Sequence, residues 1–193
     1  MKTVNWLLVL FIGLLGCSKT APDPAFSGDT KAWLNEQAWG GFSTSWKNPG
    51  DSCGINTINL SIENKLPCPK ARLQATAYCA GYCGDQELTF IRVPLAVGVY
   101  SVYSLSIPQP CQATTNQVGV SFTTLIGGDV IRDQYQLDST RPATIKVIRY
   151  DPQAGEIEGT FDVSLVRDKR RQATSDAAET VNFRNGLFKA KLP

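Results

Sequence analysis

The residues of this chain best suited to chemistry are its six cysteines, because the sequence contains no histidine. Cys17 ends an apolar leader, and the other five cysteines are Cys53, Cys68, Cys79, Cys83 and Cys111. In an oxidising compartment, five thiols form at most two disulfides and leave at least one cysteine over. We expect Cys53–Cys68 and Cys79–Cys83 to be structural disulfides and Cys111 to be free, with other connectivities left open.

Two further roles for these cysteines are less well supported. The C-x-x-x-C spacing of Cys79 and Cys83 differs from the C-x-x-C motif of redox pairs, and no parallel β-α-β pattern surrounds it. Thiolates bind soft metals such as zinc or copper, but oxidised cysteines do not, and no histidine is present to complete a site. We therefore expect neither a metal nor a cofactor.

The absence of histidine also removes the usual general base and the Ser-His and Cys-His nucleophile pairs. Asp85 and Glu87 form a close carboxylate pair beside a turn, but glycosidases hold two carboxylates about 5 to 9 Å apart across a cleft. Four aspartates have irregular spacing that lacks the D-x-D-x-D pattern of a calcium loop: Asp129, Asp133, Asp138 and Asp151. We interpret all of these as solvated residues and predict that the protein is not an enzyme.

Aromatic residues are concentrated near the start of the body of the chain, at Trp33, Trp39, Phe42 and Trp46. Binding proteins often hold sugars or peptides on such side chains, whereas large aromatic residues in β-proteins more often fill the core. We expect Trp33 and Trp39 to pack in the core or at its edge. Trp46 lies between Ser45 and Lys47 and is the best candidate for an exposed binding residue.

Charge gives little indication of a polyanionic partner. The chain has 19 Lys and Arg against 17 Asp and Glu, a net charge of +2, so we expect no nucleic-acid binding. The basic segment Arg167–Arg171 follows the end of a predicted strand and is interpreted as a solvated loop. An anionic partner, such as a lipid headgroup or lipopolysaccharide, is the alternative.

The first 17 residues have the parts of a secretory signal peptide: a basic start at Lys2, an apolar run from Val4 to Leu15, and a small residue before Cys17. Leu14-Leu15-Gly16-Cys17 resembles the bacterial lipobox, in which the cysteine is lipidated and becomes the first mature residue. We therefore predict a signal peptide over 1–16, a lipidated tether over 17–25 and a single domain over 26–193.

From Phe26 onward the hydrophobic pattern has a period of two, which predicts strands. In 156–165, Ile157, Phe161 and Val163 share one face with Gly159. The strand 144–150 precedes it, and the turn-forming segment 151–155 predicts a hairpin between the two. Asn185-Gly186 predicts a second hairpin that pairs Phe183 with Phe188.

The remaining predicted strands are 30–34, 38–44, 55–62, 72–78, 88–93, 98–106, 118–125 and 133–137. About ten short strands separated by turn signals predict an all-β protein, an antiparallel β-sandwich, with a lipocalin-like β-barrel as the alternative.

Several of these segments together resemble a family of Bacteroidota lipoproteins of unknown function. The resemblance is carried by the lipobox and by segments that run through the chain: Lys31–Trp39, Leu88–Pro94, Gly98-Val99-Tyr100, Ile157–Phe161 and Asn185–Phe188. It implies a β-rich lipoprotein and transfers no catalytic residue.

The function expected from these features is a non-enzymatic binding or interaction module of the cell envelope, with an envelope protein or glycan as its partner. The lipid on Cys17 would attach it to the bacterial outer membrane, with the periplasmic leaflet favoured and surface display open. The alternatives are a periplasmic barrel that binds a small lipid or glycan, an enzyme inhibitor, and a hydrolase that uses carboxylates alone.

Overall fold

The computed structural model describes residues 29–47, 56–66, 84–104, 117–126, 130–170 and 177–193. Several of the predicted features lie outside these residues: the signal peptide, the tether, all six cysteines, Asp129, Arg171 and the predicted strand 72–78. The disulfide and lipidation predictions therefore stay predictions.

Ten strands and no helix make up the described part of the chain. They are β1 (Thr30–Leu34), β2 (Gln37–Trp46), β3 (Thr57–Leu66), β4 (Gly84–Pro94), β5 (Gly98–Ser104), β6 (Val118–Ile126), β7 (Val130–Leu137), β8 (Thr144–Asp151), β9 (Glu156–Arg167) and β10 (Thr180–Lys191). The all-β prediction is confirmed, and most strands fall within a few residues of their predicted bounds.

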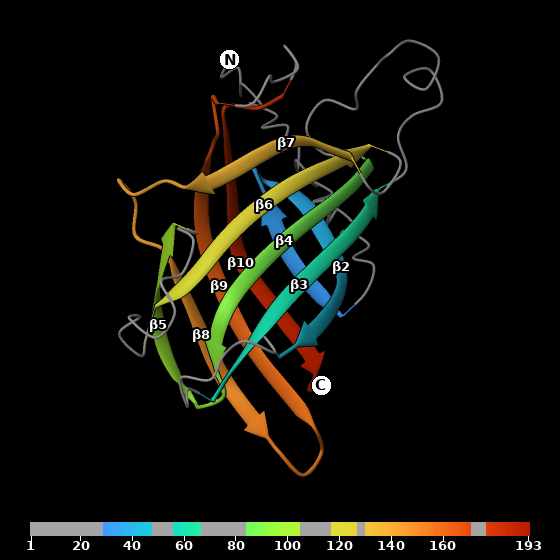
Figure 1. Ribbon diagram of the computed structural model, residues 1–193, viewed down its shortest axis with the longest axis vertical. Helices are drawn as coiled ribbons and strands as arrows, with labels where there is room; N and C mark the ends of the chain where they lie inside the picture. Colours follow the sequence, from blue (N-terminus) through green and yellow to red (C-terminus); the bar gives the residue numbers. More distant parts are fainter. Residues whose placement is uncertain (1–28, 48–55, 67–83, 105–116, 127–129, 171–176) are drawn as a thin grey trace, which may run out of the picture.

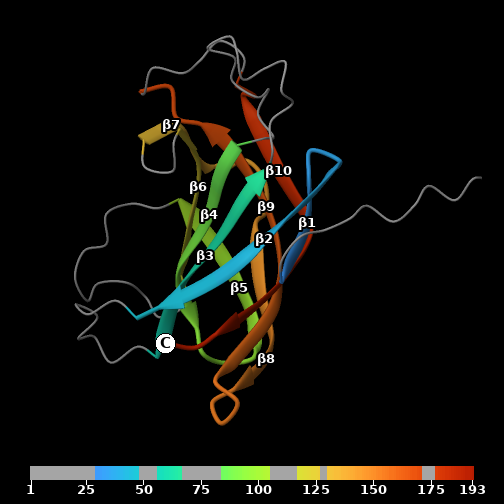
Figure 2. The same ribbon diagram turned by 90° about the vertical axis from the view of Figure 1, so that its right-hand side faces the viewer.

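These strands form one sheet that closes on itself. Its order is β10-β1-β2-β3-β4-β6-β5-β8-β9-β7, and additional pairings join β9 to β10 and β6 to β7. Figure 1 shows β3, β4 and β6 crossing in front of β8, β9 and β10. In Figure 2, β4 and β6 lie on one side of the molecule and β9 and β10 on the other. The bonding is thus barrel-like while the two sides pack as in a sandwich, which fits both predicted architectures.

One strand pair departs from the antiparallel prediction. β5 runs parallel to β6, with Val102 opposite Val118 and Ser104 opposite Val120. The first half of β5 is instead antiparallel to β8. The chain between β5 and β6 is longer than a hairpin turn, as a parallel connection requires. The sheet is therefore mixed, and local alternation within each strand carries no information about this pairing.

An aromatic cluster joins the two sides of the core. The Phe183 ring lies 4.9 Å from Trp39, 5.1 Å from Phe122 and 6.4 Å from Phe161, measured between ring centroids. All four rings are at most 1% exposed, and they come from β2, β6, β9 and β10. Since edge-to-face and tilted contacts of this kind add to the hydrophobic burial, the cluster links strands far apart in the sequence.

The predicted hairpin at Asn185-Gly186 is wrong, because β10 passes straight through it. A two-residue type I′ turn needs positive φ at both residues, and here only Asn185 has it, at 50°. Arg184 and Asn185 together oppose Asp162 of β9, so the two residues form a β-bulge, and the Asn185 amide donates to Asp162 Oδ1 at 3.0 Å. The bulge shifts the inward-facing positions from Val181 and Phe183 to Gly186, Phe188 and Ala190.

Two glycines make room for phenylalanine rings across this strand pair. Phe188 lies opposite Gly159, and Phe161 lies opposite Gly186. A Cβ atom on Gly186 would lie 2.5 Å from Phe161, and one on Gly159 would lie 2.5 Å from Phe188. Each ring therefore occupies the space above a glycine on the neighbouring strand.

We expect Gly186→Ala to lower the free energy of unfolding by about 1–3 kcal/mol, because the new methyl group overlaps the Phe161 ring. The matched control is Gly155→Asn at the β8–β9 turn. Gly155 has a φ of 63° and open space around it, and asparagine tolerates that backbone conformation. Urea denaturation measures both variants. Equal losses, or no loss for Gly186→Ala, would contradict this account of the packing.

Candidate functional site

The structure separates the three tryptophans that the sequence singles out. Trp39 is 1% exposed, and its Nε1 donates to Gln86 Oε1 at 2.7 Å, so it is a core residue. Trp33 and Trp46 are 36% and 38% exposed. Trp33 lies opposite Ala38, which is eight residues, or about 26 Å, along β2 from Trp46. The two exposed tryptophans therefore cannot form one binding surface.

Trp46 belongs to a set of residues on the outer side of the sheet that cross β2, β3, β4 and β6 in three rows. Most are exposed or half-buried, but Ser61 and Asn59 are only 2% and 5% exposed. Successive rows are two residues apart on each strand, because side chains alternate between the two faces. From β2 outward, the first row is Phe42, Glu63, Glu87, Thr123 and Gln134; the second is Thr44, Ser61, Thr89, Ser121 and Gln136; the third is Trp46, Asn59, the Ile91–Arg92 bulge, Gly119 and Tyr103. We call this surface the hydroxyl face.

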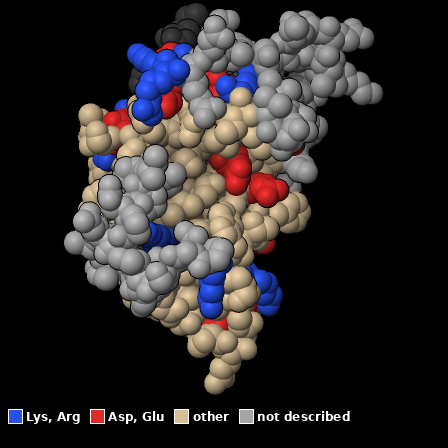
Figure 3. All heavy atoms as spheres, viewed as in Figure 1, with Lys and Arg blue, Asp and Glu red and all other residues tan. Residues whose placement is uncertain are grey.

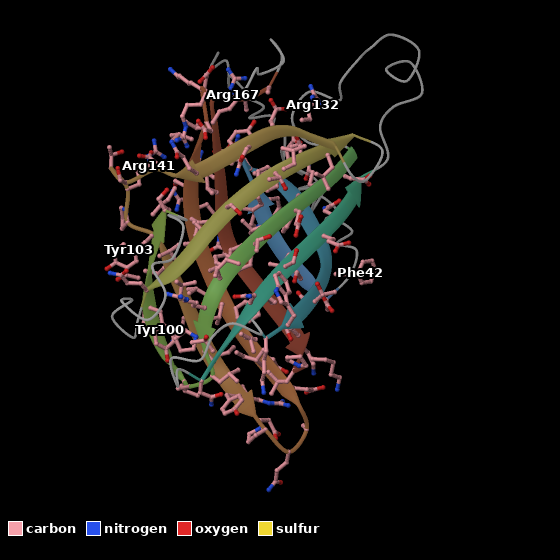
Figure 4. The ribbon with its side chains drawn as sticks, viewed as in Figure 1. Phe42, Tyr100, Tyr103, Arg132, Arg141 and Arg167 are labelled. Carbon is pink, nitrogen blue, oxygen red and sulfur yellow. The ribbon has the colours of Figure 1, made fainter. Side chains whose placement is uncertain are left out.

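The middle row of the hydroxyl face has short side chains. Its four positions on β2, β3, β4 and β6 are serine or threonine, whereas the outer rows contain the longer side chains of Phe42, Glu63, Glu87, Trp46 and Tyr103. Figure 4 shows Phe42 projecting from one margin of the molecule and Tyr103 from the opposite margin. Phe42 is 63% exposed and Tyr103 is 45% exposed. The face is therefore a strip of hydroxyl groups with aromatic rings at its borders.

Two carboxylates face each other in the first row. Glu63 lies directly opposite Glu87, a pairing of like charges that costs free energy unless other groups compensate. The hydroxyls of Ser61 and Thr89 donate to Glu87 Oε1 at 2.7 and 3.2 Å. The carboxylate pair predicted from the sequence, Asp85 and Glu87, does share this outward side of β4. Figure 3 shows acidic side chains gathered over β3 and β4, beside a wider uncharged surface.

The third row contains a strained residue. Arg92 has a φ of 63°, a conformation that long side chains rarely adopt, and its amide donates to Asn59 Oδ1 at 3.1 Å. Ile91 and Arg92 together oppose Asn59, which makes this a β-bulge in β4. Within the described part of the chain, no ion pair or side-chain hydrogen bond holds the Arg92 guanidinium. Such strain is frequent at functional sites, so Arg92 is a site candidate that sequence reasoning missed.

The other outer surface, on β8, β9 and β10, is an ion-pair network. Glu156 contacts Arg149 at 2.8 Å, Lys191 at 2.6 Å and Lys189 at 3.1 Å, and Glu158 contacts Lys189 at 3.2 Å. Hydrogen bonds from Lys191 and Lys189 lower the pKa of Glu156 from 4.5 to about 2. The charges of these five side chains are thus already paired within the protein.

Two arginines of the basic segment predicted as a loop lie at the end of β9 and are likewise paired. Arg167 forms an ion pair with Glu179, and Arg170 binds both carboxylate oxygens of Asp168, with Nη2 to Oδ2 at 2.8 Å. A surface pocket of about 520 Å³ adjoins these groups, lined by residues that include Gln136, Lys169 and Thr180. Because Arg167 and Arg170 are held by carboxylates, these two arginines are already neutralised, and Lys169 is the remaining cation in the lining.

Four polar residues face the interior at one end of the core. Sequence reasoning did not single out Asn64, Gln86 or Thr124, and its interpretation of Asp133 as a solvated residue is wrong, because Asp133 is 3% exposed. Asn64, Gln86, Thr124 and Asp133 lie in register on β3, β4, β6 and β7, and each is at most 6% exposed. Thr124 donates to Asp133 at 3.1 Å, Gln86 accepts from Trp39, and the Asn64 side chain donates to Gly40. In the sequence they can be recognised as polar residues at alternate positions of each strand where the other side chains are apolar and face the core.

The described ranges contain neither a metal-binding cluster nor a membrane-spanning helix. No group of three or more acidic, cysteine or histidine side chains gathers there to hold a metal ion. These ranges also contain no helix with the length and apolar character needed to cross a bilayer.

Comparisons of the chain with family models, with curated proteins and with solved structures find no match.

We expect Glu156→Gln to lower the melting temperature at pH 7. The pKa of Glu156 is depressed in the folded state, so its stabilising effect is present above the ordinary value of 4.5 and is lost as the pH falls toward about 2. The difference in melting temperature between the variant and the parent protein should therefore disappear as the pH falls from 4.5 to about 2. It should also become smaller in high salt, because the ion pairs are exposed.

The control for this experiment is Glu63→Gln, which removes a carboxylate outside the network and next to Glu87. It should cause no loss at pH 7, since it relieves a like-charge pair. A Glu156→Gln deficit that persists unchanged at pH 2 would contradict the proposed ion-pair contribution. Thermal melts followed by circular dichroism between pH 2 and pH 7 supply the measurement.

Proposed function

We propose that this protein is a non-enzymatic lipoprotein of the bacterial cell envelope that binds a partner through its hydroxyl face. The observation that carries the proposal is the contrast between the two outer surfaces. On β8–β10 five charged side chains form one ion-pair network, whereas the hydroxyl face keeps exposed aromatic rings and a strained Arg92 whose guanidinium pairs with no other described residue. Side chains that a fold leaves exposed at such cost are candidates for contact with a partner.

The packing of the core favours this proposal over a barrel that binds a small ligand. An internal binding site needs an open interior, and the aromatic cluster around Phe183 fills the centre of this one. A carboxylate-only hydrolase receives no support from the described geometry either, since Glu63 and Glu87 lie on an open sheet surface rather than across a cleft.

The leader supports the envelope location. The lipobox at Leu14–Cys17 and the resemblance to Bacteroidota lipoproteins place the protein, in this proposal, at the outer membrane, with the periplasmic leaflet favoured. A short tether after Cys17 would hold the domain near the membrane surface and leave the hydroxyl face accessible.

We expect Cys17→Ser to release the protein from the membrane fraction, because the modified cysteine carries the only lipid in the proposal. Fractionation of producing cells, together with incorporation of labelled palmitate, measures this effect. Cys111→Ser is the matched control and should stay with the membrane. A Cys17→Ser variant that remains unprocessed and fully membrane-bound would favour an uncleaved anchor instead.

Binding itself is tested by photo-crosslinking in producing cells. A benzoylphenylalanine in place of Phe42, at the border of the hydroxyl face, should form a discrete crosslinked product with an envelope component. The control is the same photoprobe at Lys146, which is also exposed but lies on the other outer surface. Equal crosslinking from both positions, or none from position 42, would contradict the assignment of the binding surface.

A further inference from the structure

We propose that the ligand of the hydroxyl face is a neutral oligosaccharide, a step that rests on the function proposed above. The juxtaposition behind it is the middle row of serine and threonine hydroxyls between two rows that carry Phe42, Trp46 and Tyr103. Sugars combine apolar C–H faces with dense hydroxyl groups. A surface that recognises them therefore needs both aromatic rings and small polar groups within a few ångströms.

The aromatic residues supply the first requirement. Trp46 and Tyr103 stand at the two ends of the third row, and Phe42 stands at the end of the first. A row that crosses five strands spans about 19 Å at the usual strand spacing of about 4.8 Å, which accommodates a short oligosaccharide. Trp and Tyr also contribute large, rigid contact areas at low cost in conformational entropy.

The polar residues supply the second requirement. Thr44, Thr89 and Ser121 hold their hydroxyls on short side chains, so a ligand can lie close to the sheet. Gln134 and Gln136 at the β7 end present amides that both donate and accept hydrogen bonds. Groups of this kind pair with sugar hydroxyls in either direction.

The charge of the surface argues for a neutral ligand. The three rows contain two carboxylates, Glu63 and Glu87, against the single cation Arg92. Phosphorylated, sulfated or uronic-acid ligands would meet net repulsion there. A carboxylate, by contrast, accepts hydrogen bonds from the hydroxyls of a neutral sugar.

The same surface is poorly suited to a protein partner. The centres of protein interfaces are apolar, but Ile91 is the one aliphatic side chain in the three rows. The well-exposed aliphatic residues of the described chain lie elsewhere, including Val99 on β5, Ile148 on β8 and Leu187 on β10. The hydroxyl face therefore fits a polyhydroxylated ligand better than an apolar protein surface.

The test uses the full lipidated chain in a detergent without a sugar headgroup. An array of neutral gluco-, xylo-, manno- and galacto-oligosaccharides is probed beside anionic uronic-acid and sulfated glycans. We expect binding to at least one neutral series, followed by calorimetry with the soluble hexasaccharide of that series. Trp46→Ala and Tyr103→Ala should each weaken binding by about tenfold, or about 1.4 kcal/mol.

Trp33→Ala is the matched control, because Trp33 has nearly the same exposure as Trp46 but lies off the hydroxyl face. It should change the affinity by less than about twofold. A further variant, Thr44→Arg, fills the middle row without removing an aromatic ring. It should abolish binding. Circular dichroism of each variant confirms that the fold is retained.

Three results would overturn the inference: no binding to any neutral glycan at concentrations up to about 1 mM, binding to anionic glycans alone, or equal losses for Trp33→Ala and Trp46→Ala. If crosslinking from position 42 succeeds while the array shows no neutral binder, the oligosaccharide inference fails and the proposed function stands. If both experiments fail, the hydroxyl face is a solvated sheet surface and both proposals fall.

Discussion

The contact of the Phe183 ring with rings from both sides of the sheet is the interaction on which the rest of the structure depends. Trp39 and Phe122 approach it from β2 and β6, and Phe161 approaches it from β9. Because these rings fill the centre, the alternate residues of each neighbouring strand that face inward must pack against them. The residues between them face outward and can have other roles, and on one side of the molecule they form the hydroxyl face.

Closure of the sheet around this cluster requires local irregularities. The β10 bulge at Asn185 lets Phe183 and Phe188 both face the core, although they are five residues apart and would otherwise face opposite sides. The β4 bulge at Arg92 does the same for Phe90 and Val93. Bulges bend and twist a strand and change where its side chains point. The strained Arg92 on the surface is thus coupled to the packing of the interior.

Much of the fold follows from local alternation, and the candidate site does not. The strand over 156–165 is amphipathic enough to be found from its sequence, and its hairpin with 144–150 is confirmed. The same alternation could not separate a bulge from a hairpin at Asn185-Gly186, since both reverse the hydrophobic phase and both favour asparagine in a left-handed conformation. The hydroxyl face was not predictable, because Trp46, Glu87 and Tyr103 come to lie on one face only through the strand order.

The two outer surfaces show why exposed polar residues in one protein need not have one role. On β8–β10, Glu156 and Glu158 each have cations within ion-pairing distance, so these charges contribute to stability and solubility. On the hydroxyl face, Glu63 and Glu87 oppose each other and Arg92 adopts an unfavourable backbone conformation, so both features oppose folding. Structure that opposes folding persists only if the rest of the molecule outweighs it, and the closed aromatic core supplies that excess. Positive φ also occurs on the other surface, at Asn185 of β10, so backbone strain alone does not distinguish the hydroxyl face. The opposed carboxylates of Glu63 and Glu87 do, and a partner that donates hydrogen bonds to them is the proposed reason for their position.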